Sequence, residues 1–117
     1  MNTDYQAIAS LLFPAGLLEY FDVTSYEKQG ESIIFELSEK NIIPEEYNSY
    51  KLVSKGFKEP ITIEDFPLRG NTVSLYVRRR KWTIKETKKV VSRDWDLTAK
   101  GTRKTHEFAA FLKEINR

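Results

Sequence analysis

The residues best suited to binding chemistry form a basic run, Arg78-Arg79-Arg80-Lys81, which is followed at once by Trp82. Arginine makes bidentate contacts to phosphate groups and to guanine edges. Consecutive residues of a strand point to opposite faces, so we expect at least two of these cations to face solvent together. Trp82 is a candidate for stacking on a base and equally a candidate for a core residue. The run predicts contact with nucleic acid; the alternative is a charged edge strand that blocks aggregation.

Further basic residues are expected to extend this surface. Lys88, Lys89 and Arg93 belong to the hairpin that the run begins. Arg103 and Lys104 open the last predicted helix, where a cation opposes the helix dipole and so does not serve helix stability. We therefore predict that the four cations of the basic run contact phosphates and that these five residues make outer contacts.

Other kinds of site find little support. The chain has no cysteine and a single histidine, His106, so neither a disulfide nor a protein-built zinc centre is expected. The acidic pairs Glu45-Glu46 and Glu64-Asp65 are strand or turn neighbours whose side chains diverge, and Asp65 is expected to bond backbone amides in a turn. No residue set resembles a catalytic triad or a phosphate-cradling glycine loop. We expect no catalytic residue, no metal, no cofactor and no enzymatic activity.

The charge of the chain is divided unevenly along its length. Residues 1–66 hold 12 acids and 5 bases, whereas residues 67–117 hold 14 bases and 5 acids. The two parts carry −7 and +9, which together give the net charge of +2. Such a split points to a strongly charged partner, most often nucleic acid.

The pattern of the chain predicts one α+β domain over residues 1–117, with an acidic half at 1–66 and a basic hairpin with the C-terminal helix at 67–117. Small antiparallel β hairpins are flanked by an N-terminal and a C-terminal helix. The predicted elements are a helix from Thr3 to Pro14, strands at 20–27 and 32–38, a helical turn after Pro44, strands at 61–65, 72–82 and 89–92, and a helix after Thr102 that carries Phe108, Phe111, Leu112 and Ile115 on one side. Pro67 is expected to end the strand at 61–65, and Trp95 to be a packing anchor.

Several motifs resemble a known family, the small N-terminal region proteins of bacterial insertion-sequence transposases of the Aon-one type, related to the ISL-three family. The resemblance spans residues 5–117 and is densest from 56 to 113. It is carried by residues 65–70 (DFPLRG), 79–82 (RRKW), 93–95 (RDW), 101–103 (GTR) and 107–112 (EFAAFL), together with Val73, Leu75 and Val77.

The resemblance implies a DNA-recognition module for the ends of a transposon, with a binding role for Arg79, Arg80, Lys81 and Trp82. The larger family has a zinc-ribbon-like unit, a helix-turn-helix and an acid-triad nuclease domain. This sequence lacks the zinc cysteines, a complete helix-turn-helix and the catalytic acids. A degenerate zinc ribbon held by packing alone is therefore expected, without DNA cleavage or strand transfer.

The resulting hypothesis is a non-catalytic DNA-binding accessory domain of a transposase, whose partner is double-stranded DNA at the transposon ends. The alternative is a protein-protein adaptor that docks onto a separately encoded catalytic transposase subunit. A relic with neither affinity is a further alternative. No membrane association is expected, because the apolar runs are too short to span a bilayer and the start of the chain lacks a basic leader, so the predicted location is cytoplasmic.

Overall fold

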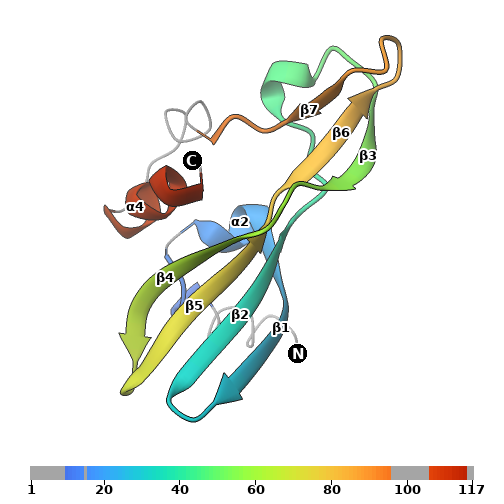
Figure 1. The fold of residues 1–117 in the computed structure, drawn as a ribbon. Coiled ribbons are helices and arrows are strands. Elements are labelled where there is room, and N and C mark those ends of the chain that lie inside the picture. Colours follow the sequence, from blue (N-terminus) through green and yellow to red (C-terminus); the bar gives the residue numbers. More distant parts are fainter. Residues whose placement is uncertain (1–9, 15, 96–105, 116–117) are drawn as a thin grey trace, which may run out of the picture.

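The computed structural model describes residues 10–14, 16–95 and 106–115, with the side chains of 106–109 left out. These residues form two β-sheets that follow one another along a long axis (Figure 1), in a molecule of 50 × 34 × 28 Å. One sheet has the strand order β1-β2-β5-β4, and the other has the order β3-β6-β7. The short helix α2, Leu17–Tyr20, and the helix α4, His106–Ile115, accompany the four-stranded sheet. The α+β class predicted from the sequence is confirmed.

The four-stranded sheet begins with the predicted hairpin. It is formed by β1, Phe21–Gln29, and β2, Ser32–Glu39, which pair antiparallel. Gly30 supplies the left-handed backbone conformation of the turn, with φ of 59°. Phe21 of β1 and Leu37 of β2 are buried, whereas the residues of β1 that follow Phe21 are all exposed. This edge of the sheet is therefore open to solvent over the described residues.

A parallel pairing joins this hairpin to the rest of the sheet. The strand β5, Asn71–Arg78, lies parallel to β2, with Phe35 opposite Leu75. On its other side β5 pairs antiparallel with β4, Ile61–Leu68. The sequence predicts these strands but not the parallel pair, because pairing between distant segments leaves no local signal.

Pro67 does not end β4 as predicted. The strand runs to Leu68, with an irregular register between Asp65 and Leu68. Proline cannot donate a hydrogen bond to a neighbouring strand, but β4 is an edge strand, and a proline at an irregular edge position breaks few ladder bonds. The expected end of the strand is thus a local distortion within it.

The two sheets are joined by strands that continue from one sheet into the other, and we call this connected pair of sheets the ribbon. β6, Arg80–Ile84, follows β5 after the single residue Arg79, so the predicted strand at 72–82 passes through both sheets. β3, Leu52–Phe57, pairs with β6 and leads into β4. The return strand predicted at 89–92 is β7, Val90–Ser92, which pairs with β6. The helical turn predicted after Pro44 is a 3-10 turn, Glu45–Tyr47.

Each sheet has its own apolar core. In the four-stranded sheet Val73, Leu75 and Val77 of β5 pack with Phe111 and with Trp95, which is the expected packing anchor. The second core is smaller and consists of Trp82, Ile84 and Val91, with Tyr47 and Leu52 packed against it.

The predicted helices are covered only in part. Phe111, Leu112 and Ile115 of α4 are buried as predicted, whereas Thr102 lies outside the described residues. Most of the helix predicted from Thr3 to Pro14 lies outside them too. No helix in the described part of the chain is long and apolar enough to cross a membrane.

Candidate nucleic-acid interface

Arg79 is the central residue of the predicted basic run, and the fold buries it. Only 8% of its surface is exposed. Its guanidinium donates hydrogen bonds to the carbonyl oxygens of Ile115, at 3.1 Å, and Glu59, at 3.2 Å. Its Nε has no partner among the described residues. Arg79 thus ties the end of α4 to the junction of the two sheets, and its predicted contact with phosphate has no exposed surface to support it.

The burial of Arg79 follows from the alternation of β5. Val73, Leu75 and Val77 are buried on one face of the sheet, and Arg79 continues the same alternation. In β6 the buried positions are Trp82 and Ile84, so the buried face changes from odd-numbered to even-numbered positions at the junction. The expectation that neighbouring cations of the run face solvent together fails at Arg79 for this reason.

Arg80 is also engaged within the protein. Its backbone N–H donates to Oε1 of Glu39 at 2.8 Å, and its Nε donates to the carbonyl oxygen of Glu39 at 3.1 Å. A further guanidinium nitrogen donates to Oγ of Ser54 at 2.6 Å, and the group lies over the ring of Phe57. Arg80 therefore holds the end of β2 against β3 and β6.

Glu39 is the buried carboxylate that joins these strands, with 1% of its surface exposed. Its second oxygen accepts a hydrogen bond from Nε of Arg93 at 3.1 Å, in an ion pair that is itself buried. Burial raises the pKa of Glu39 above its usual value, and the Arg80 amide and Arg93 oppose that rise. Arg93 also donates to the carbonyl oxygen of Ile42 at 2.7 Å. Arg93 thus serves the junction.

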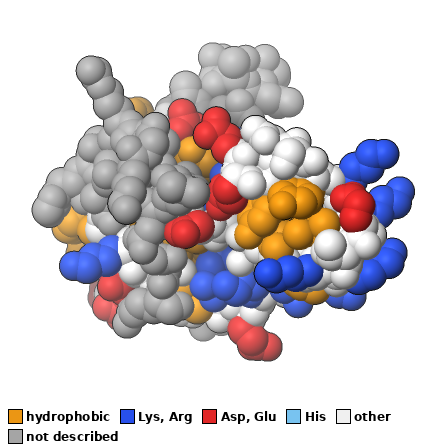
Figure 2. All heavy atoms as spheres, turned by 90° about the horizontal axis from the view of Figure 1, so that it is seen from above, with side chains coloured by type: hydrophobic (Ala, Val, Ile, Leu, Met, Phe, Trp, Pro, Cys, Tyr) orange, Lys and Arg blue, Asp and Glu red, His pale blue; other side chains and the backbone are white. Residues whose placement is uncertain are grey.

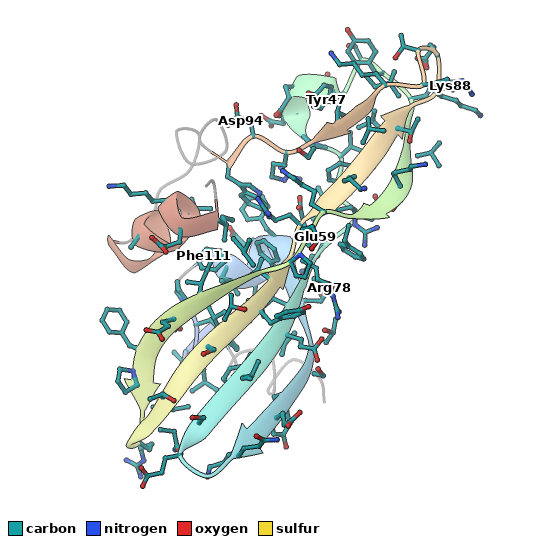
Figure 3. The ribbon with its side chains drawn as sticks, viewed as in Figure 1. Tyr47, Glu59, Arg78, Lys88, Asp94 and Phe111 are labelled. Atoms are coloured by element: carbon teal, nitrogen blue, oxygen red, sulfur yellow. The ribbon has the colours of Figure 1, made fainter. Side chains whose placement is uncertain are left out.

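The remaining aromatic and arginine candidates lie in structural positions as well. Trp82 is fully buried and donates from Nε1 to Oδ1 of Asn41 at 2.8 Å, so of the two roles open to it the core role is the one that the fold provides. Arg78 is half-buried and pairs with Oε1 of Glu36 at 3.1 Å. Figure 3 places Arg78 near the middle of the molecule, close to the junction of the two sheets, and Lys88 at the tip of the three-stranded sheet. Arg103 and Lys104 lie outside the described residues.

The lysines of the three-stranded sheet behave differently from the arginines. Among the described residues none of them has a side-chain hydrogen bond or ion pair, and all are exposed or half-exposed. The set comprises Lys51, Lys55, Lys58, Lys81, Lys85, Lys88 and Lys89. Lys and Arg side chains gather along one side of the molecule when it is viewed from the end that carries Lys88 (Figure 2). We call these seven residues the lysine surface.

Pairing of β3 with β6 brings Lys51, Lys55 and Lys58 to this surface, although all three belong to the acidic half of the sequence. The signal for this was present, since residues 51–58 contain three lysines and no acid. A count of charge along the sequence conceals this cluster of lysines. The cluster becomes visible only in the fold, because the strand that carries these lysines pairs with a segment from the basic half.

An open groove of about 700 Å³ runs along the lysine surface. It is lined by Lys58, Lys81 and Lys89, with Ser92 and Asp94 on the β7 side. Lys81 pairs with Ser92 across β6 and β7, so both side chains lie on the face of the sheet opposite to Trp82. The three amines and the Arg93 guanidinium outnumber the single carboxylate of Asp94, which gives this lining a net positive charge that suits phosphate groups.

Lys58 has an unusual electrostatic environment in this groove. Partial burial lowers the pKa of its amine, the buried Arg79 guanidinium lowers it further, and Glu39 offsets part of the effect. The charged form of Lys58 is therefore less stable here than in water. A bound anion would favour that charged form, because opposite charge nearby raises the pKa of an amine.

The β6–β7 loop presents two more amines at the tip of the ribbon. The backbone N–H of Lys88 donates to the carbonyl oxygen of Ile84 at 2.7 Å, which closes the loop. Lys88 has φ of 66°, in the left-handed region that favours glycine. Lys85 and Lys88 are exposed on this tight turn. The loop thus accepts backbone strain at a position that carries a charged side chain.

No group of three or more histidine or carboxylate side chains capable of holding a metal ion is present within the described ranges. The amide of Asp94 donates to Oε2 of Glu46, which uses one of the acids in a local contact. The side chain of Asp65 has no hydrogen bond or ion pair in the described part of the chain, so the predicted bonds to backbone amides are not seen there.

Comparisons with known proteins give no family for the chain. No protein-family model matches it, and neither a curated protein nor a solved structure does.

Proposed function

We propose that the protein binds double-stranded DNA without catalysis, through the lysine surface rather than through the arginine run. The observation that carries this proposal is the division between arginines engaged inside the fold and seven lysines without side-chain partners among the described residues. Phosphate contacts supply most of the sequence-independent affinity for DNA, and solvated amines are ready to make them. The DNA-binding residues are thus Lys58, Lys81, Lys85, Lys88 and Lys89.

The ribbon shape supports duplex DNA as the ligand. Only the β6–β7 loop is proposed to enter the major groove of B-DNA, which is about 12 Å wide, because β3 borders the other side of β6. The β6–β7 hairpin ends in Lys85 and Lys88, and the groove with Lys58 and Lys81 lies behind it, toward the junction. The hairpin tip would enter the major groove of the DNA, while the lysines behind the tip contact the flanking phosphates. In this proposal, transposon ends are the preferred DNA, in keeping with the family resemblance of residues 56–113.

A charge-matched pair of double variants tests the proposal. Lys81→Gln with Lys89→Gln removes two cations from the lysine surface, and Lys28→Gln with Lys40→Gln removes two from the four-stranded sheet. We expect the first pair to weaken binding of a labelled 30-base-pair duplex about tenfold and to reduce the log–log salt slope by about two units. The second pair should change both quantities much less. Fluorescence anisotropy between 50 and 200 mM salt measures affinity and slope.

Two results would contradict the proposal. One is the absence of duplex binding by the unaltered protein at 50 mM salt. The other is an equal loss of affinity in both double variants, which would indicate attraction by overall charge alone. Thermal unfolding of each variant confirms that it is folded before its affinity is interpreted.

A further inference from the structure

A second groove lies on the four-stranded sheet, between β4 and α4. It has a volume of about 400 Å³, within the range of about 300 to 1,000 Å³ typical of ligand pockets. Its apolar lining comprises Pro14, Ile63, Phe66, Pro67, Leu75, Ala110 and Phe111. Figure 3 shows Phe111 on α4 close to the sheet, at a distance from Lys88 and the tip of the ribbon. The groove is therefore separate from the lysine surface.

Phe66 lies outside the buried core, at the irregular end of β4. Its surface is 69% exposed, which is high for an aromatic side chain in a strand. The register between β4 and β5 breaks after Asp65 and resumes at Leu68, and Pro67 lies within the break. Phe66 forms one wall of the groove. A large apolar side chain exposed beside an apolar groove marks a site for another molecule.

The charge of this groove is one-sided. Among the described residues, three carboxylates line it, Glu64, Asp65 and Glu114, and no basic side chain does. Asp65 pairs with Val73 across β4 and β5, so alternation puts its side chain on the same face as the buried Ile63. In the described ranges the side chains of Asp65 and Glu64 have no hydrogen-bond or ion-pair partner. An unpaired carboxylate on an apolar face is most readily complemented by a cation.

We propose that this groove docks a segment of a partner protein in which an apolar side chain lies next to lysine or arginine. The apolar side chain would pack against Phe66, Phe111 and Leu75. The neighbouring cation would pair with Asp65, with Glu64 at the rim. The acid-lined groove of the four-stranded sheet would thus bind a basic protein segment, while the lysine surface binds DNA. The two sites are independent.

The test uses the full chain and two labelled 12-residue peptides. One alternates leucine with lysine, and the other alternates leucine with glutamate. We expect the lysine peptide to bind at least tenfold more tightly, and its binding to shift the amide NMR signals of residues 63–66, 68 and 110–114 rather than those of 80–90. Equal affinity for the two peptides, or shifts confined to 80–90, would overturn the proposal.

Matched variants assign the site. Phe66→Ser should weaken binding of the lysine peptide about tenfold, whereas Tyr26→Ser, at another exposed aromatic residue of the same sheet, should not. Asp65→Asn should weaken it about fivefold, while Glu31→Gln, at an exposed acid in the β1–β2 turn, leaves it unchanged. Binding that survives both Phe66→Ser and Asp65→Asn would overturn the proposal.

Two further measurements separate the remaining explanations. The Phe66→Ser variant should bind duplex DNA with the same affinity as the unaltered protein. The peptide-binding proposal and the DNA-binding proposal can therefore fail separately. Sedimentation at 10 to 200 μM tests for a second copy of the chain in the groove. A dimer that Phe66→Ser abolishes would make that copy the occupant and would overturn the proposal of a basic partner segment.

Discussion

At the level of single residues, arginine and lysine serve different purposes in this chain. The guanidinium of Arg79 donates to two carbonyl oxygens from separate elements, and that of Arg80 reaches both Glu39 and Ser54. A planar group with several fixed donors is suited to joining strands in this way. The lysine ammonium is a compact, strongly hydrated charge, and in the three-stranded sheet the described lysines leave it without a side-chain hydrogen bond or ion pair.

Arg79→Ala should lower the stability of the protein. The change leaves the carbonyl oxygens of Ile115 and Glu59 without their donor and removes a buried aliphatic stem. We expect the free energy of unfolding to fall by about 2 to 4 kcal/mol, as measured by urea denaturation. Lys85→Ala, at an exposed residue, is the control and should change it by less than about 0.5 kcal/mol. Equal stability of the two variants would contradict the structural role of Arg79.

The junction residues also show what the sequence can predict at this scale. The burial of Arg79 was open to prediction, because it extends the alternation of Val73, Leu75 and Val77 by one step. The burial of Trp82 was not open to prediction, because the buried side chains change from odd-numbered positions in β5 to even-numbered positions in β6. Glu39 gave no local signal, since its partners Arg80 and Arg93 lie 41 and 54 residues away in the chain.

At the level of elements, two tight turns have the same backbone feature at opposite ends of the ribbon. Lys88 lies in the β6–β7 loop with φ of 66°, and Arg69 lies in the β4–β5 turn with φ of 52°. Both are cations in the left-handed region that glycine occupies without steric cost. The two positions therefore provide a matched pair for separating backbone strain from charge.

Lys88→Gly and Arg69→Gly should each leave the free energy of unfolding unchanged or raise it by up to about 1 kcal/mol, because glycine relieves the strain. Only Lys88→Gly should weaken duplex DNA binding, with a decrease of about one unit in the salt slope. Chemical denaturation and anisotropy titrations of both variants give the two quantities. The same loss of affinity in Arg69→Gly would contradict the assignment of DNA contact to the β6–β7 loop.

The junction of β2 with β6 should respond to pH through Glu39. Its pKa in the folded protein is raised, chiefly by burial, so the folded state binds this proton more tightly than the unfolded state does. Stability from this group is therefore gained as the pH falls and is lost as the pH rises through the folded pKa. We expect the unfolding free energy of the unaltered protein to rise relative to that of Glu39→Gln as the pH falls from 7 toward 4.5, in urea denaturation at each pH. A constant difference would contradict the raised pKa.

The hairpins were predictable and the sheet order was not. The alternating residues of β2 and the turn at Gly30 give a local signal for the first hairpin, and the same holds for β6 and β7. β3 was missed because Ser54, Lys55 and Gly56 interrupt its apolar pattern. The pairing of β2 with β5 joins segments that are 40 residues apart at Ser32 and Thr72, which no short-range pattern specifies.

At the level of the whole molecule, the charge divides by sheet rather than by half of the sequence. The lysine surface belongs to the three-stranded sheet, whereas the acid-lined groove belongs to the four-stranded sheet. The long axis of 50 Å separates the tip of the ribbon from the β1–β2 turn at the other end (Figure 1). A duplex bound at the lysine surface would therefore leave the four-stranded sheet exposed to a second partner.

Fluorescence energy transfer tests this orientation, and the absence of native cysteine makes the labelling simple. A dye on Thr87→Cys, in the β6–β7 loop, should transfer energy efficiently to an acceptor on the end of a bound 12-base-pair duplex. The same dye on Gln29→Cys, beside the β1–β2 turn, should show much lower transfer. Equal transfer from the two positions would contradict binding at the lysine surface.

The ribbon that joins the sheets also bears on how such a protein can be lengthened. Both β3 and β6 continue into the four-stranded sheet, through residues 58–60 and through Arg79. Two residues added to each strand, in facing positions, would extend the reach of the hairpin by about 7 Å. They would also keep every side chain on its present face, whereas one residue added to each would invert the tip. Because β7 also pairs with β6 and Arg93 returns to Glu39 at the junction, β7 would need the same two added residues for its pairing to be kept.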